Sequence, residues 1–99
     1  MTYPDQTNEI YTLLDGVTSD TTGAATGIVN QRRNQYGMGQ LKIASGTPSV
    51  AIYGRIDSTM NWGLITTLTD EVPTLIALMP EMYADATSVT GATTCKLRI

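Results

Sequence analysis

A chain of 99 residues with 41% hydrophobic content has room for one modest globular core, and its charged content of 15% is low for a soluble domain. The formal net charge is −3 with only six basic residues, so the basic footprint that nucleic-acid binding needs is absent. No apolar run reaches the roughly 18 residues of a membrane span. We therefore expect neither a nucleic-acid partner nor a membrane partner.

The first 27 residues predict an arm and a loop in front of the folded domain. Residues 1–9 are polar, and the apolar run of residues 10–14 can form one strand before the turn signal of Asp15 and Gly16. Residues 15–27 are small and polar with three glycines, which is typical of a long contact loop. We assign residues 1–27 to an extended N-terminal arm and loop, and residues 28–99 to a single β-sandwich domain.

From residue 28 onward, apolar and polar residues alternate with the period of half-buried strands. Residues 38–44, 50–56 and 95–99 show this alternation most clearly, whereas residues 75–79 are continuously apolar and predict a strand buried on both sides. Turn signals recur at a spacing of roughly 8 to 12 residues, which favours an all-β fold. We expect a small antiparallel β-sandwich or barrel of jelly-roll or immunoglobulin-like size.

Residues 54–69, GRIDSTMNWGLITTLT, place the single tryptophan directly after a polar turn. The carboxylate of Asp57 can accept hydrogen bonds from amides two or three residues further on, which predicts an Asx-type hairpin turn. We interpret this turn as a folding element, and ligand binding by it is the alternative. Four residues of the returning strand share the face that we assign to the core: Trp62, Leu64, Thr66 and Leu68.

The chain has no histidine and one cysteine, which excludes Ser-His-Asp and Cys-His catalysis and a structural zinc site. A carboxylate pair such as Asp57 with Asp70 or Glu71 is the remaining catalytic candidate, but nothing in the spacing brings the two groups together. We expect no enzyme, and we name no catalytic, cofactor-binding or metal residue. Cys95 alternates with charged neighbours, which favours a core position over a reactive thiol. A lone cysteine and a start without signal-peptide features indicate synthesis in a reducing cytoplasm.

Residues 32–36, RRNQY, form the most polar cluster of the chain. They are either a contact patch for an acidic partner or a solvated loop, and runs of charge usually face water. The chain has five tyrosines and no phenylalanine, a balance that suits half-wet interfaces. Our candidate residues for a protein interface are Tyr3, Tyr11, Arg32, Arg33 and Tyr36.

The order of these features resembles the small all-β virion proteins of tailed bacteriophages. Members of that group carry a hairpin in which an alternating strand with a glycine leads through an Asp turn to a tryptophan. A proline-led strand, a glycine turn and a closing strand follow. This chain departs from the pattern at Ser58, where the group commonly has glycine, and at Tyr83 or Ala84, where it often has arginine. The residues that match are Val50, Ile52, Gly54, Ile56, Asp57, Trp62, Ile65, Pro80, Gly91, Leu97 and Ile99.

The resemblance implies a non-enzymatic virion structural protein, a capsid decoration or cement protein made in the host cytoplasm. Its partners would be the major capsid protein or other virion proteins. Closed symmetry would favour a homo-oligomer such as a trimer, and the arm of residues 1–27 would become ordered on a neighbour. The alternative is a carbohydrate-binding adhesin module of a tail or fibre, because discoidin-like lectin domains carry a turn similar to residues 57–62. That alternative needs exposed aromatic rings, and the predicted loops hold little besides Tyr36.

Overall fold

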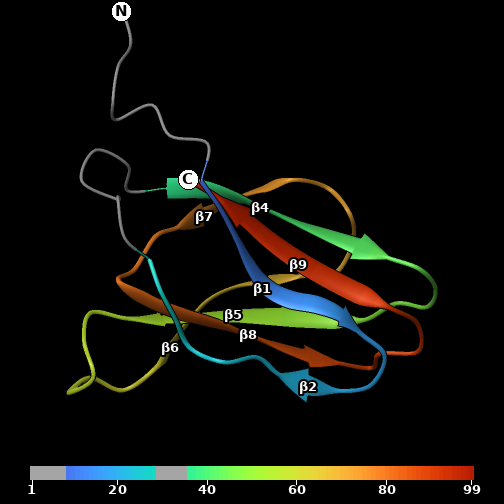
Figure 1. Ribbon diagram of the computed structural model, residues 1–99, viewed down its shortest axis with the longest axis horizontal. Helices are drawn as coiled ribbons and strands as arrows, with labels where there is room; N and C mark the ends of the chain where they lie inside the picture. Colours follow the sequence, from blue (N-terminus) through green and yellow to red (C-terminus); the bar gives the residue numbers. More distant parts are fainter. Residues whose placement is uncertain (1–8, 29–35) are drawn as a thin grey trace, which may run out of the picture.

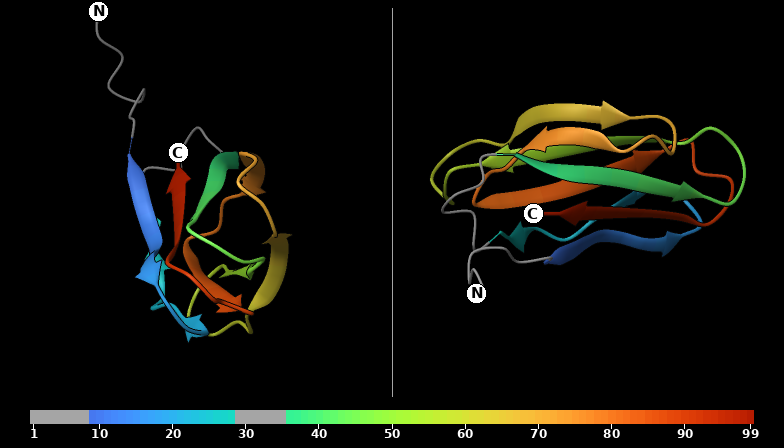
Figure 2. Two further views of the ribbon diagram at one scale, coloured as in Figure 1. Left: turned by 90° about the vertical axis from the view of Figure 1, so that its right-hand side faces the viewer. Right: turned by 90° about the horizontal axis from the view of Figure 1, so that it is seen from above.

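The structure is a computed structural model that describes residues 9–28 and 36–99, and every regular element in those residues is a β-strand. The strands form two antiparallel sheets packed face to face (Figure 1 and Figure 2), which confirms the predicted all-β sandwich. No helix in the described residues has the length and apolar character to cross a bilayer. The strands are β1 (Ile10–Val17), β2 (Thr21–Thr22), β3 (Thr26–Gly27), β4 (Tyr36–Ile43), β5 (Ser49–Arg55), β6 (Gly63–Leu68), β7 (Thr74–Ala77), β8 (Glu81–Thr87) and β9 (Thr93–Arg98).

The two sheets combine strands that are far apart in the chain. One sheet, called sheet A, has the order β1-β9-β4-β7. The other, called sheet B, has the order β2-β8-β5-β6, and β3 also pairs with β8. The first and last long strands, β1 and β9, therefore lie side by side (Figure 1). Each sheet has one face toward the core and one outer face toward solvent.

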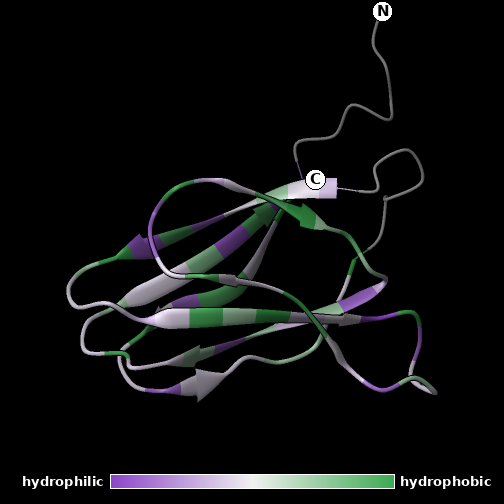
Figure 3. Ribbon diagram, turned by 180° about the vertical axis from the view of Figure 1, so that it is seen from behind, coloured by the Kyte–Doolittle hydropathy of each residue, from purple (hydrophilic) through white to green (hydrophobic). Residues whose placement is uncertain are grey.

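The core lies between the two sheets and is built from every second residue of the strands. In β5 and β8, buried and half-buried residues alternate strictly, and Figure 3 shows hydrophobic bands alternating along the strands. Burying each large aliphatic side chain contributes about 1.5–3 kcal/mol, so this alternation supplies most of the folding free energy. The fully buried residues are Val50, Ile52, Ile76, Met82, Ala84, Ala86, Cys95 and Leu97, together with Pro48 and the polar Thr93.

The predicted loop over residues 15–27 is wrong for most of its length. β1 continues through Asp15 and Gly16 to Val17, with register shifts after Thr12 and after Leu14. Gly16 has a φ of 61°, a left-handed conformation that glycine adopts without strain. β2 and β3 then pair with β8. Residues 10–27, which we assigned to an arm and a loop, thus contribute strands to both sheets.

The predicted core position of Trp62 is also wrong, and a β-bulge is the reason. Ile52 lies opposite Thr66, but Tyr53 lies opposite Leu64, so β6 carries one extra residue. One extra residue in a strand changes the face on which the side chains beyond the bulge lie, here those of Leu64 and Trp62. Leu68 is therefore buried, whereas Leu64 is 60% exposed and Trp62 joins it on the outer face.

Two further apolar residues of the predicted strands are exposed. Ile56 follows the end of β5 and has left the sheet. Leu75 lies on β7, which we expected to be buried on both sides, but β7 is an edge strand of sheet A with an outer face. Only its inward residue Ile76 reaches the core.

Candidate functional site

The outer face of sheet A carries a row of exposed apolar side chains that crosses the sheet. Leu75 on β7 pairs with Met38 on β4, Met38 pairs with Arg98 on β9, and Arg98 pairs with Ile10 on β1. Directly paired residues share one face of a sheet. Leu75 is 62% exposed, Ile10 59% and Met38 42%, and Tyr36 lies two residues before Met38 on the same face. We call Ile10, Tyr36, Met38 and Leu75 the apolar row.

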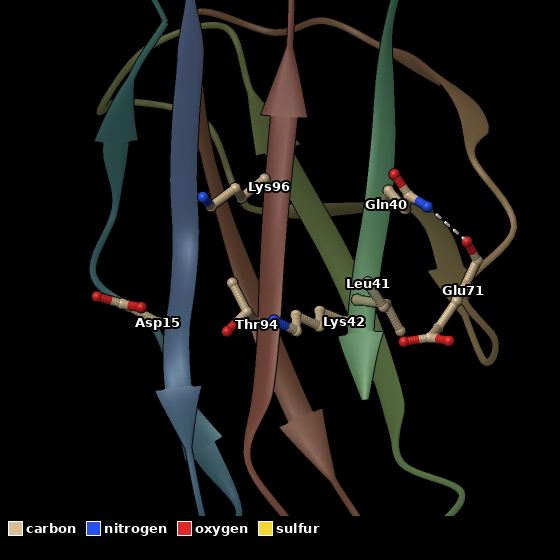
Figure 4. A pocket seen from close by; sticks show the side chains of 7 residues that line it. All are labelled: Asp15, Gln40, Leu41, Lys42, Glu71, Thr94 and Lys96. Carbon is tan, nitrogen blue, oxygen red and sulfur yellow. Dashed lines mark hydrogen bonds between the residues drawn. The ribbon is translucent and has the colours of Figure 1, made fainter. Parts of the chain in front are cut away.

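A shallow, open hollow of about 530 Å³ lies further along the same face (Figure 4). At its β4 side, Gln40 Nε2 donates to the backbone oxygen of Glu71 at 3.0 Å, and the Glu71 carboxylate accepts from the Ile43 amide at 2.8 Å. At its β1 side, Thr94 Oγ1 accepts from the Gly16 amide at 2.9 Å. The residues that line the hollow are Asp15, Gln40, Leu41, Lys42, Glu71, Thr94 and Lys96.

The outer face of sheet B holds an aromatic cluster of Tyr53, Tyr83 and Trp62. Tyr53 and Tyr83 are cross-strand neighbours whose rings stack at 5.0 Å between centroids, with 10° between the planes. The Trp62 ring meets Tyr83 edge-on at 4.7 Å, and the Arg55 guanidinium lies over the indole. Burial, followed by the nearby Tyr53 and the Asp85 carboxylate, raises the pKa of the Tyr83 hydroxyl. All three rings are half-buried.

The five predicted interface residues fall into different places. Tyr36 is 56% exposed at the start of β4 and belongs to the apolar row. Tyr11 is half-buried against the core, and its hydroxyl donates to Glu9 Oε2 at 2.8 Å. Tyr3, Arg32 and Arg33 lie outside the described residues. Ile10, Met38 and Leu75 are not among the residues predicted from the sequence. The position of Met38 could have been found, because it lies four residues before the outward-facing Lys42 and therefore on the same face of the strand.

The turn and the cysteine behave as the sequence indicates. Asp57 Oδ1 accepts from the Thr59 amide at 2.9 Å and from the Thr59 hydroxyl, which confirms the Asx-type turn. These hydrogen bonds hold the pKa of the Asp57 carboxyl below its usual value. Cys95 is fully buried, which confirms its core position, and burial raises the pKa of its thiol to about 12.

Within residues 9–28 and 36–99, no three His, Cys, Asp or Glu side chains gather as metal ligands would. Comparisons with protein-family models, with curated proteins and with solved structures find no match. The described residues present the apolar row and the hollow on sheet A, and the aromatic cluster on sheet B.

Proposed function

We propose that this protein is a non-enzymatic virion structural protein, a capsid decoration or cement protein that binds other virion proteins through the outer face of sheet A. The observation that carries the binding role is the apolar row. Met38 and Leu75 form an exposed apolar pair, with Tyr36 on the same strand as Met38 and Ile10 beyond Arg98, and exposed apolar side chains gathered on one face of a small domain mark a contact site. The virion assignment is supported by the resemblance in sequence to small all-β proteins of tailed bacteriophages. The major capsid protein is the partner we propose.

The apolar row can stabilise a complex because a partner would bury its exposed apolar side chains. Ile10, Met38 and Leu75 come from three different strands, so a partner that covers sheet A removes all three from water at once. Each such side chain can contribute up to about 1.5–3 kcal/mol, against which stand the entropic costs of association. A protein that binds only the assembled shell stabilises that shell by mass action. A closed oligomer such as a trimer would multiply the effect.

The test is the amount of this chain in purified particles of the phage that encodes it, measured by quantitative mass spectrometry against the major shell protein. A copy number comparable with that of the shell protein is the expected result. A much smaller number would move the protein to the neck or the tail. Complete absence from the particles would overturn the virion assignment.

A second candidate function is carbohydrate binding, and the aromatic cluster is the observation that favours it. Sugars pack their C–H faces on aromatic rings, and the outward turn of Trp62 brings three rings together outside the core. The carboxylates of Glu81 and Asp85 lie on the neighbouring outward positions of β8 and can accept hydrogen bonds from sugar hydroxyls. Against this candidate, the guanidinium of Arg55 already lies over the indole of Trp62.

The single tryptophan provides the readout for this second candidate. Titration with polysaccharide purified from the surface of the host bacterium should change the fluorescence of Trp62 in a saturable way if the cluster binds sugar. A Trp62→Phe variant followed by calorimetry separates sugar binding from optical artefacts. Unchanged fluorescence and no heat of binding would remove the carbohydrate candidate.

A further inference from the structure

We infer that the outer face of sheet A binds an extended acidic segment of its protein partner, with an apolar residue followed by acidic residues two and four positions later. The inference rests on the proposed protein-binding function and names the chemistry of the partner. It follows from the distribution of charge on the two sheets, from the hollow, and from the spacing between the hollow and the apolar row.

Positive charge is concentrated on this face. Of the four basic residues in the described part of the chain, Lys42, Lys96 and Arg98 have side chains on the outer face of sheet A. The fourth, Arg55, lies on sheet B, where its Nε donates to Glu81 Oε1 at 2.7 Å. Asp15 and Glu71 lie on the same face, so its charges are close to balanced, whereas the whole chain carries a net charge of −3. Such a face attracts an acidic surface and repels the same face of a second copy.

The hollow places donors where a carboxylate can reach them. Lys42 extends from β4 toward Thr94, and Lys96 extends from β9 toward β1 (Figure 4). No ion pair within the described residues involves Lys42 or Lys96. Since Thr94 Oγ1 accepts from Gly16, its hydroxyl proton can point to a ligand. A carboxylate that enters here gains charge-assisted hydrogen bonds.

Two acidic groups also line the hollow and restrict how a ligand can enter. The Glu71 carboxylate is engaged by the Ile43 amide at 2.8 Å, on the β4 side. Asp15 lies at the β1 side and would repel an incoming carboxylate. An acidic segment should therefore follow β4, β9 and the Lys96 side of β1, and keep away from Asp15. Removal of the Asp15 charge is expected to strengthen binding.

The spacing along the strands sets the pattern of the ligand. Met38 and Arg98 form one cross-strand pair, Gln40 and Lys96 form the next pair on this face, and Lys42 with Thr94 forms the third. At about 3.3 Å per residue, Lys96 lies about 7 Å and Lys42 about 13 Å along the sheet from Met38. Side chains two and four positions apart in an extended segment share one face at this same spacing. When the apolar side chain of the ligand packs on Met38, the acidic side chains two and four positions later in the ligand therefore reach Lys96 and Lys42.

Two synthetic peptides of equal composition test this pattern. The first, acetyl-Gly-Leu-Thr-Glu-Thr-Glu-Gly-amide, has both acids on the face of its leucine, and the second, acetyl-Gly-Leu-Glu-Thr-Glu-Thr-Gly-amide, has them on the opposite face. Titration into ¹⁵N-labelled protein at low salt should shift amide signals of β4 and β9 with the first peptide. The second peptide should bind about fivefold more weakly, which is the effect of one charge pair at a partly screened surface.

Charge variants supply the second arm of the test. Lys42→Gln and Lys96→Gln should each weaken binding of the first peptide several-fold, and Asp15→Asn should strengthen it, with unchanged melting temperatures because all three side chains are exposed. Equal binding of both peptides, shifts confined to sheet B, or no shifts at all would overturn the inference. If the protein binds the first peptide but is missing from particles, this inference stands and the virion role is overturned. If Leu75→Asp abolishes binding to particles but the wild-type protein binds neither peptide, the proposed function stands and this inference is overturned.

Discussion

The guanidinium carbon of Arg55 lies 4.0 Å from the centroid of the Trp62 ring, and the same guanidinium binds Glu81. The largest side chain of the protein is therefore held on the outer face of sheet B by a cation and by the ring of Tyr83. It does not fill the space between the sheets. Removal of the tryptophan should therefore lower the free energy of unfolding by less than removal of a core aromatic residue would.

Trp62→Ala is expected to lower the free energy of unfolding by about 1–2 kcal/mol. One exposed cation–π contact contributes about 0.5–1 kcal/mol and one aromatic pair about 0.5–1.5 kcal/mol. Truncation of a core aromatic residue would cost about 3–5 kcal/mol. Urea denaturation followed by far-UV circular dichroism measures the difference, with Leu64→Ala as a control for an exposed neighbour on the same strand. A loss in the core range would contradict the outer-face position.

A second prediction concerns Gly37 on β4, where the backbone of β9 approaches closely. A Cβ atom at this position would lie 2.6 Å from the backbone oxygen of Arg98 and 3.1 Å from a methyl group of Leu78. A backbone oxygen within a paired strand cannot move away cheaply, so Gly37→Ala should destabilise the fold by about 1–3 kcal/mol. Gly63→Ala is the matched control, because its Cβ would meet no atom nearer than 3.8 Å. Equal melting temperatures for the two variants would show that the β4–β9 contact is looser than described.

The limits of sequence reasoning are visible in particular residues. The alternation in β5, β8 and β9 predicts these strands because most of their core-facing residues are apolar and most of their outward neighbours are polar or aromatic. β2 and β3 consist of threonines and a glycine, so they have no apolar pattern and depend on pairing with β8. The bulge in β6 is invisible in sequence, because Leu64 and Ile65 are both apolar and either can face the core.

The candidate site was less accessible to prediction than the fold. The outward direction of Met38 follows from the parity of its strand, since Leu41 faces the core. That Met38 lies in one row with Ile10 and Leu75 depends on the order of strands in sheet A, which joins segments from both ends of the chain. No local pattern contains that information. The register of pairing decides which isolated apolar residues become one surface.

The third prediction tests this surface by adding charge to it. Leu75→Asp should abolish incorporation into particles or weaken it at least tenfold, because a charge in the apolar row must be desolvated on docking. Leu64→Asp is the control, since Leu64 is 60% exposed against 62% for Leu75 but lies on sheet B. Both variants should keep the melting temperature of the wild type. Incorporation that falls with Leu64→Asp and survives Leu75→Asp would place the contact on the other sheet.

The fourth prediction is a dependence of stability on pH that originates in Cys95. Burial raises the pKa of its thiol to about 12, from 9.0 for a solvated thiol. As the pH rises above 9.0, the unfolded chain therefore loses this proton while the folded chain retains it. The unfolded state then binds fewer protons, so the free energy of unfolding falls as pH rises, by up to about 1.4 kcal/mol per pH unit. Below the pKa of the unfolded thiol, both states are protonated and Cys95 adds no dependence on pH.

A Cys95→Ala variant isolates this contribution from the tyrosines and lysines that titrate in the same range. The variant starts less stable, because it leaves a small space in the core, but its pH profile should be flatter. Urea denaturation from about pH 8 to about pH 10.5 should show the wild type losing about 2 kcal/mol more than the variant. Parallel profiles would mean that the thiol ionises as easily in the folded protein as in the unfolded chain. That outcome would require water to reach the centre of β9, which is incompatible with a closed contact between the two sheets at Cys95.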